Sequence, residues 1–570
     1  MKKTLLILAA LLLTAGWIPA QDRVVERTYL STDKDVYVAG DPLWYSAFCL
    51  DASRGTFSPV SSIAYVELHN TEGVVCTGKV ALSGGRGAGR LLLPGTLPTG
   101  NYRLVAYTAQ NKAELGYDYT GIASKTISVY NVFSNERVKD GVEVVSEEEY
   151  EALRSPVKPG MTPNVMPGSD RASLELSWSD GVLTLVNPTG KVASLSVSVW
   201  HDDGFLSNGN PTIAAFADGC RLVGPRHFDN WITPEYEGEI IQGHVAGVSP
   251  ETLSSLVGRY AFISTPSDKS DIYASPIDIE GKVRFFTGNI YGNKECVCEI
   301  EGMDPSFNGF IELDSPFAAA PVAPVAPMKM SPSMREPLRQ RSLAMQIEQK
   351  FTADTLYDWL PAKENGLFGT EEIVYPLDDY TRFTTMEEVF VEFVKEIRAR
   401  RWSDRRRNLQ VRLNDRTDAT FSRDTTLMML DGVPVFDQQK ILDYDPLLVE
   451  SIHIYPYTTF IGSRSFEGIV NFVTYKHNLP SFKFGNNVRV IDFQGVSWPM
   501  ASTGAALLSE SGYPDYRQTI YWHPLLELAP GQKREIPCKM PDYKGRFRVV
   551  VEGLTVDGTP LRATTSFTTE

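Results

Sequence analysis

The sequence predicts a mainly β, multi-domain protein in which β-sandwiches accompany one small α+β unit. Short segments of alternating apolar and polar residues recur about every ten residues, separated by Gly/Pro turns, which is typical of β-sandwiches. One capped amphipathic helix stands among short strand signals in the second half of the chain. An apolar content of 42% and an aromatic content of 11% are enough for hydrophobic cores. The length of 570 residues favours several domains.

The N-terminus has the pattern of a secretory signal over residues 1–20. A short basic start precedes the apolar run Thr4–Leu13, and Ile18-Pro-Ala20 offers small residues for cleavage. The run is too short to span a bilayer, and no cysteine stands at the cleavage site to carry a lipid. No other stretch is long and apolar enough for a transmembrane helix. We therefore expect an exported protein, in the periplasm or associated with the outer membrane.

The segment 21–131 predicts the first sandwich. Strand signals flank the turn at Gly40-Asp41, and further strands are expected at Ile63–His69 and Gly100–Tyr107. The patterns D-K-x-x-Y-x-x-G-D and L-P-x-G-x-Y-R-L-x-A-Y resemble the second domain of the alpha-2-macroglobulin family. That resemblance implies an immunoglobulin-like sandwich. It does not imply protease trapping, because the chain has no C-G-E-Q thioester motif.

The remaining boundaries follow changes in composition. We expect a charged, Pro-rich linker at 132–170 and a second β-sandwich region at 171–315. A Pro/Ala-rich linker with an irregular continuation should follow at 316–383. The α+β unit is expected at 384–480 and a C-terminal sandwich at 481–570.

The α+β unit begins with a recognisable helix start. Thr385 and Glu388 form the pattern of a capping box. Apolar residues then recur at helical spacing as far as Ile397, which predicts a helix of about three and a half turns. Strands are expected at Leu409–Leu413, Leu427–Leu430, Val449–Tyr455 and Ile469–Tyr475.

The run Met429–Lys476 reads M-L-D-G-V-P-V-F-D, V-E-S-I-H-I-Y and I-G-S-R-S-F-E-G-I-V-N-F-V-T-Y-K, and it resembles the plug domain of TonB-dependent outer-membrane receptors. Too few residues follow Lys476 for the barrel of about 22 strands that surrounds such a plug. No energy-coupling box is found either, so active transport is not expected. The resemblance implies structural rather than catalytic roles for Asp431, Gly432, Pro434, Gly462, Gly468 and Asn471.

One basic cluster stands out in a chain whose net charge is −15. It comprises Arg398, Arg400, Arg401, Arg405, Arg406 and Arg407. One interpretation is a solvated helix C-terminus, where cations complement the helix dipole. The other is a docking patch for an acidic partner or a lipid phosphate.

The sequence contains few signals for nucleic-acid binding, catalysis, or the binding of cofactors or metals. The acidic balance argues against nucleic-acid binding. No nucleophile elbow, zinc-protease motif, phosphate loop or dinucleotide fingerprint occurs, and no cofactor is expected. His201-Asp-Asp-Gly204 could suggest a metal, but an ordinary polar turn explains it better. The six cysteines are too sparse for a disulfide scaffold and are expected to be mainly buried thiols, with one or two disulfides or a metal as alternatives.

These patterns predict a non-enzymatic exported protein of the bacterial envelope, acting as an interaction or scaffold component beside an envelope or outer-membrane protein. One alternative is a separate plug or lid that docks into an outer-membrane barrel. Another is a hydrolase with an unrecognised site, which a pocket holding paired carboxylates or a metal would favour.

Overall fold

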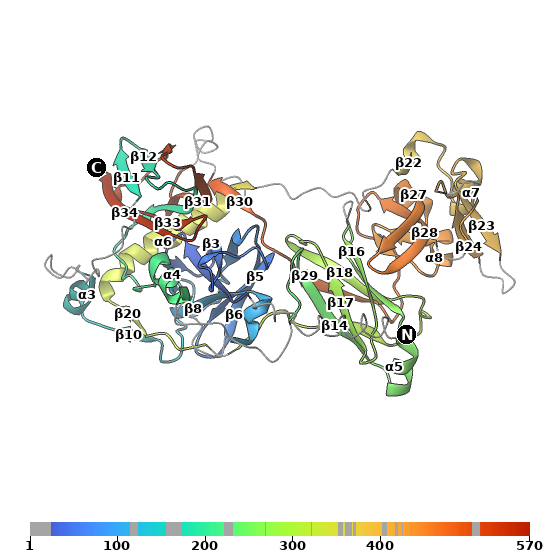
Figure 1. Ribbon diagram of the computed structural model, residues 1–570, viewed down its shortest axis with the longest axis horizontal. Helices are drawn as coiled ribbons and strands as arrows, with labels where there is room; N and C mark the ends of the chain where they lie inside the picture. The colour runs from blue at the N-terminus through green and yellow to red at the C-terminus, as the bar shows by residue number, and fades with distance from the viewer. Residues whose placement is uncertain are drawn as a thin grey trace, which may run out of the picture. The chain divides into compact units, whose positions relative to one another are not determined.

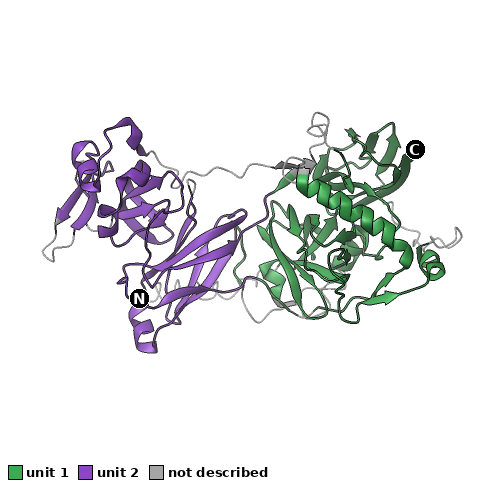
Figure 2. Ribbon diagram, turned by 180° about the vertical axis from the view of Figure 1, so that it is seen from behind, with its two compact units in different colours: residues 1–236, 317–360, 499–570 green, residues 237–316, 361–498 purple. Residues whose placement is uncertain are grey.

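The computed structural model describes residues 24–114, 124–154, 174–221, 232–267, 270–320, 322–351, 357–359, 368, 372–401, 407–415, 420–423, 426–503 and 514–569. The predicted signal peptide lies outside these residues. The chain is mainly β, as predicted (Figure 1). It divides into two compact units, coloured in Figure 2: unit 1 is Met1–Tyr236, Phe317–Leu360 and Pro499–Glu570, and unit 2 is Glu237–Pro316 and Pro361–Trp498.

Unit 1 opens with the predicted N-terminal sandwich. One sheet contains β1 (Glu26–Thr32), β3 (Pro42–Asp51), β4 (Thr56–Phe57) and β7 (Arg86–Leu92). The other has the order β2 (Val36–Val38), β9 (Lys125–Tyr130), β8 (Gly100–Tyr107), β5 (Ile63–His69) and β6 (Val74–Ala81). The strands on either side of Gly40 exist as expected, but they lie in different sheets. The chain crosses the sandwich at Gly40, whose φ of 100° favours glycine.

The second sandwich of unit 1 is assembled from two distant parts of the chain. One sheet has the order β11 (Glu175–Ser179), β12 (Val182–Val186) and β32 (Lys533–Pro537). The other has the order β31 (Thr519–Leu528), β13 (Ala193–His201), β33 (Gly545–Thr555) and β34 (Pro560–Thr569). The predicted boundaries at 171–315 and 481–570 therefore need correction. The core strand β13 finds both of its partners more than 300 residues later, and local patterns carry no information about that pairing.

The two sandwiches of unit 1 meet through hydroxyl groups. The Oγ atoms of Ser31 on β1 and Ser196 on β13 lie 2.7 Å apart. Ser198 Oγ donates to the Asp33 carbonyl at 2.5 Å, and Ser46 Oγ donates to the Pro524 carbonyl at 2.7 Å. All of these serines are at most 2% exposed. Small hydroxyl side chains let the sheets approach closely, and their hydrogen bonds satisfy groups that would otherwise be buried without partners. We call this contact the polar junction.

Helices and short strands complete unit 1. The two-stranded sheets pair β10 (Val142–Val144) with β20 (Met328–Met330) and β21 (Tyr357–Trp359) with β30 (Met500–Thr503). The helical segments are η1 (Ala109–Glu114), α3 (Glu147–Arg154), α4 (Ile213–Arg221), η2 (Pro332–Met334) and the 17-residue α6 (Arg335–Phe351), which the sequence analysis did not predict.

The Pro/Ala-rich segment is not a free linker. The backbone N–H groups of Ala318 and Ala319 donate to Glu67 at 2.9 and 3.1 Å, and the Phe317 ring packs edge-on against Tyr65. Arg103 donates to two carbonyl groups further along the same segment. The predicted separation at 316–383 is therefore wrong for its first part. Extended backbone without internal hydrogen bonds has its donors and acceptors available for side chains of the first sandwich.

Unit 2 contains a third sandwich. One sheet has the order β17 (Lys282–Phe286), β14 (Ile240–Ala246) and β19 (Phe310–Leu313). The other has the order β16 (Ile272–Pro276), β15 (Tyr260–Ser264), β18 (Asn293–Ile300) and β29 (Arg489–Gln494), and α5 (Pro250–Leu256) connects β14 to β15. Strand β29 lies within the predicted C-terminal domain but completes this sheet instead.

The rest of unit 2 is the predicted α+β module. Its main sheet has the order β22 (Ile373–Pro376), β27 (Val449–Ile461), β28 (Arg464–Thr474), β25 (Leu427–Leu430) and β26 (Val433–Pro434). A separate hairpin pairs β23 (Ile397–Arg401) with β24 (Arg407–Val411). The helical segments are η3 (Leu377–Asp379), α7 (Met386–Glu392), α8 (Gln439–Leu442) and η4 (Pro446–Leu448).

The capping box of α7 is present as predicted, but the helix is half as long as expected. Both reciprocal hydrogen bonds of Thr385 and Glu388 form. The helix ends after Glu392 because Phe393 leaves helical geometry, with φ −141°, and stacks on Tyr380 at 4.3 Å. Ile397 reaches the core from β23 rather than from a further helical turn. The spacing of apolar residues alone does not show whether Ile397 reaches this core from a longer helix or from a following strand.

The sandwich and the α+β module of unit 2 meet through apolar side chains. Phe262 of β15 is fully buried against Phe436 and Phe466, whose ring centroids lie 5.2 and 6.1 Å away. Leu427, Met429, Tyr455, Ile461 and Ile469 complete the cluster. We call this contact the apolar junction.

Candidate functional site

The structure divides the predicted basic cluster. Arg398 and Arg400 lie two residues apart on β23 and share one face of the hairpin, whereas Arg401 and Arg407 form a cross-strand pair in the alternate register. Arg405 and Arg406 lie outside the described residues. The interpretation as a helix C-terminus is wrong for the described positions, because these lie on the strands β23 and β24. Strand alternation places Arg407 on the opposite face of the hairpin from Arg398 and Arg400.

Internal contacts occupy part of this cluster. Arg398 stacks on Phe421 at 3.9 Å and donates to Gln410 at 2.9 Å. Arg407 pairs with Glu387 at 2.7 Å. Arg400 is exposed. The docking interpretation stays a prediction, and Arg400 is the described arginine best placed to test it.

The plug-like motif residues lie in turns and buried strands. Asp431 and Gly432, with φ of 47° and 79°, form the two-residue loop between β25 and β26, which is the geometry of a type I′ turn. A Cβ atom at Gly432 would lie 1.7 Å from the Ser270 hydroxyl, so glycine is required there. Gly462 takes a φ of 57° in the turn between β27 and β28, Gly468 has a φ of 82° within β28, and Pro434 ends β26.

The Asp431 carboxylate is fully buried and ties three segments together. It accepts hydrogen bonds from the Thr474 backbone N–H and hydroxyl, both at 2.7 Å, and from the Leu479 N–H at 2.8 Å. Asn471 accepts from the Gly432 N–H at 2.9 Å. These hydrogen bonds hold the β25–β26 turn against β28 and the segment that follows it.

The side chains of His201, Asp202 and Asp203 do not converge on a metal site. The His201 ring packs edge-on against Tyr543 at 4.8 Å, and burial lowers its pKa. Asp202 lies 3.7 Å from Arg546 and from Arg548, whereas Asp203 is bound by the guanidinium of Arg341. Across the part of the chain that the structure describes, no three His, Cys, Asp or Glu side chains group as metal ligands.

The cysteines behave mainly as small apolar side chains. Five of the six are buried, and Cys296 and Cys298 both belong to the core of the third sandwich. Burial raises the pKa of the Cys298 and Cys538 thiols to about 12, so these groups stay protonated.

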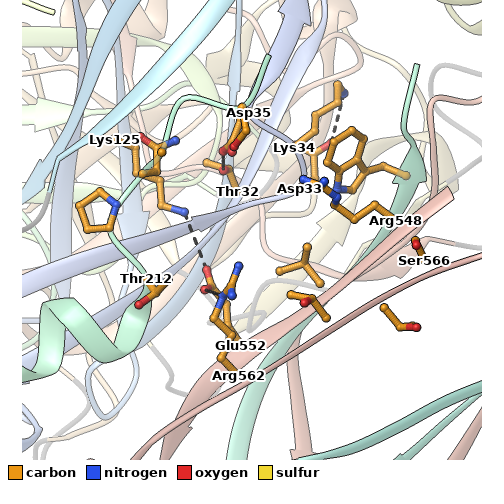
Figure 3. Close-up of a pocket in the computed structure, with 18 of the residues that line it drawn as sticks. Thr32, Asp33, Lys34, Asp35, Lys125, Thr212, Arg548, Glu552, Arg562 and Ser566 are labelled. Atoms are coloured by element: carbon orange, nitrogen blue, oxygen red, sulfur yellow. Dashed lines mark hydrogen bonds and ion pairs between the residues drawn. The ribbon is translucent and has the colours of Figure 1, made fainter. Parts of the chain in front are cut away.

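A pocket of about 460 Å³ lies in unit 1 on the outer face of the sheet β31-β13-β33-β34, next to β1 (Figure 3). Its floor is a row of polar side chains on β33 and β34, and β1 and the segment before α4 form its walls. We call it the sheet-face pocket. Its charged lining residues are Asp33, Lys34, Asp35, Lys125, Arg546, Arg548, Glu552 and Arg562.

Glu552 organises the deep end of the sheet-face pocket. Its Oε1 atom accepts from Tyr29 at 3.0 Å and from Ser31 at 2.7 Å, and lies 3.8 Å from Lys125 Nζ. Figure 3 shows Lys125 and Glu552 pointing toward each other. Arg562 approaches the other oxygen at 3.6 Å. Burial and the charge of Glu552 raise the pKa of Tyr29 well above its usual range, which keeps the phenol a donor.

The pocket mouth has a different character. The side chains of Arg546, Arg548 and Arg562 are 58%, 40% and 40% exposed, so their guanidinium groups are accessible to a ligand. Arg548 also lies 5.6 Å from the ring of Trp200. No motif in the sequence predicted this site. Its one local signal was the alternation Arg546-x-Arg548 in a predicted strand, which places two cations on the same outer face.

Comparisons with known proteins add little to this description. No family model and no curated protein matches the chain. Among solved structures, Salmonella alpha-2-macroglobulin reacted with methylamine aligns at 8% identity over 95% of this chain and 23% of that chain, with a TM-score of 0.16. Escherichia coli alpha-2-macroglobulin activated by porcine elastase aligns at 10% identity over 95% and 43%, with a TM-score of 0.23.

This chain thus spans less than half the length of either protein. Both belong to the family that residues 25–131 resemble. TM-scores this low do not establish a common fold, so the architecture rests on the sheets described above. No described helix has the length and apolarity needed to cross a membrane.

Proposed function

We propose that this chain is an exported, non-enzymatic protein of the bacterial envelope that acts as a binding or scaffold component for another envelope protein. The observation that carries the proposal is the use of buried carboxylates as structural ties. Asp431, Glu552 and Asp33 each accept several short hydrogen bonds from groups that hold strands together. A carboxylate held this way is poorly placed to exchange a proton with a substrate.

The arrangement of modules also supports a scaffold. In both units the modules pack on one another through buried contacts, which gives each unit a fixed surface for a partner. Rigid elements hold a recognition surface more precisely than isolated loops do. The exposed Arg400 on the β23–β24 hairpin is a candidate contact for an acidic partner.

The proposal can be tested by in-cell cross-linking of the full chain, gentle-detergent purification and mass spectrometry, followed by reconstitution with the purified partner. We expect one envelope protein to bind stoichiometrically. Arg400→Ser should slow association at low salt if the hairpin contributes, whereas Lys476→Ser, an exposed cation on another loop, serves as the matched control. A chain that stays alone, or that turns over ester, glycoside or peptide substrates, would contradict the proposal.

A further inference from the structure

The floor of the sheet-face pocket is formed by one face of a sheet, from the inner strands β13 and β33 to the edge strand β34. Arg548 on β33 lies opposite Ser566 on β34 and Trp200 on β13, and Val550 lies opposite Thr564. These side chains project from three neighbouring strands. The backbone groups of β13 and β33 are committed to sheet ladders on both sides, so a ligand that lies over these strands must be recognised by side chains.

Positive charge dominates the accessible part of the pocket. Arg546, Arg548 and Arg562 are all at least 40% exposed, whereas the Glu552 carboxylate is 4% exposed and already has four partners. Asp202, the acidic neighbour of Arg546 and Arg548, contacts each at 3.7 Å, which is too long for a strong hydrogen bond. The guanidinium groups therefore retain donors for a carboxylate or phosphate, which arginine binds in a bidentate manner.

Hydroxyl groups and one indole ring surround these cations. Thr564, Ser566 and Ser207 line the pocket together with Trp200. Hydroxyl side chains both donate and accept hydrogen bonds, which matches the hydroxyl groups of a sugar. The Trp200 ring offers an apolar surface for the C–H face of a sugar ring. We propose that the sheet-face pocket binds an acidic saccharide, with its carboxylate or phosphate held by Arg546 and Arg548.

An acidic peptide fits this lining less well. A peptide that adds to a sheet needs a free strand edge, whereas Arg546 and Arg548 lie on β33, which has a partner strand on each side. Its apolar side chains would also need sockets, whereas the lining is made largely of charged and hydroxyl residues. The volume of about 460 Å³ lies within the usual range for small-ligand pockets.

Calorimetric titration of the full chain tests this inference. The probes are tri-galacturonic acid, the neutral maltotriose, tri-glutamate and inorganic phosphate. We expect tri-galacturonic acid to bind at least tenfold more tightly than each of the other three. The double variant Arg546→Ser/Arg548→Ser should weaken that binding at least tenfold. Arg339→Ser/Arg534→Ser removes two exposed arginines outside the pocket, and should leave it unchanged.

A second variant separates ring stacking from charge. Trp200→Leu should weaken tri-galacturonic acid several-fold. Equal affinity for tri-glutamate would assign the site to acidic peptides, and equal affinity for phosphate would make it a simple anion site. Either result overturns the saccharide inference, as would no binding of tri-galacturonic acid, or binding that both pocket variants leave intact while circular dichroism shows the fold retained.

Discussion

The polar junction of unit 1 and the apolar junction of unit 2 join neighbouring modules by opposite means. In unit 1, buried serine hydroxyls and Glu552 connect β1 and β3 to the sheet that contains β13. In unit 2, Phe262 lies among aromatic and aliphatic side chains of the α+β module. An apolar contact gains most from area removed from water, whereas a buried polar contact gains little net energy but penalises any arrangement that leaves a group unpaired. The difference predicts distinct responses to mutation.

The largest effect is expected at the apolar junction. Phe262→Ala removes a fully buried ring and leaves a cavity that neighbouring strands can only partly fill. Such substitutions typically cost about 3–5 kcal/mol. Hydrogen exchange measured by mass spectrometry should show loss of protection in β15 and β25 while unit 1 keeps its protection. Equal loss in both units, or no loss, would break the comparison.

The second largest effect is expected to depend on pH, because the sandwich of unit 2 contains a buried carboxylate, Glu299. Glu299 on β18 is 8% exposed, and its buried Oε1 atom has no hydrogen-bond partner. Burial raises its pKa to about 8, although Lys440 opposes the shift. The unfolded chain loses this proton near pH 4.5, so between pH 4.5 and 8 only the folded state keeps it.

Stability should therefore fall as pH rises through that window, by at most about 1.4 kcal/mol per pH unit, and level off above it. Urea unfolding from pH 4.5 to 8.5, followed by pulsed hydrogen exchange in peptides from β15 and β18, measures the slope. Glu299→Gln should flatten it and be more stable than the natural chain at pH 8.5. A slope that survives this substitution would mean that another group titrates.

The smallest effect is expected at the polar junction, where it takes the form of coupling. Ser31→Ala or Ser196→Ala alone removes one hydroxyl of a bonded pair and should cost about 1–2 kcal/mol. The double variant should cost less than the sum, because the hydrogen bond between the two hydroxyls can be lost only once. A double-mutant cycle by urea unfolding measures this coupling, and strict additivity would contradict the bonded pair.

The sequence predicted local features well where short-range chemistry determines them. The capping box at Thr385 and the turn at Asp431-Gly432 each need only a few neighbouring residues, and both are present. Sheet membership was harder to predict, because β13 pairs with strands that no local pattern links to it. Helix α6 was not predicted, because one of its buried positions is a charged residue. Arg341 points inward and pairs with Asp203, which interrupts the apolar pattern expected of a buried helix face.

The sheet-face pocket could not be predicted from local sequence patterns for a related reason. Lys125, Trp200 and Arg548 come from three separate stretches, and only the long-range pairing of β13 with β33 brings two of them together. The Arg398–Arg407 cluster shows the opposite case. These residues are close in the sequence, but strand alternation places Arg407 on the opposite face of the hairpin from Arg398 and Arg400.

The assembly of unit 1 from three stretches of chain has a consequence for how the protein folds. During synthesis from the N-terminus, β13 emerges long before β31 and β33, so its apolar side chains must wait for residues near the end of the chain. Such distant pairing is slow, because a long loop must close before any contact forms. The first sandwich can form early from local strands, whereas the second stays open and prone to aggregation until the last strands arrive. A nascent chain of this kind would depend on chaperones for longer than one with the same modules in sequential order.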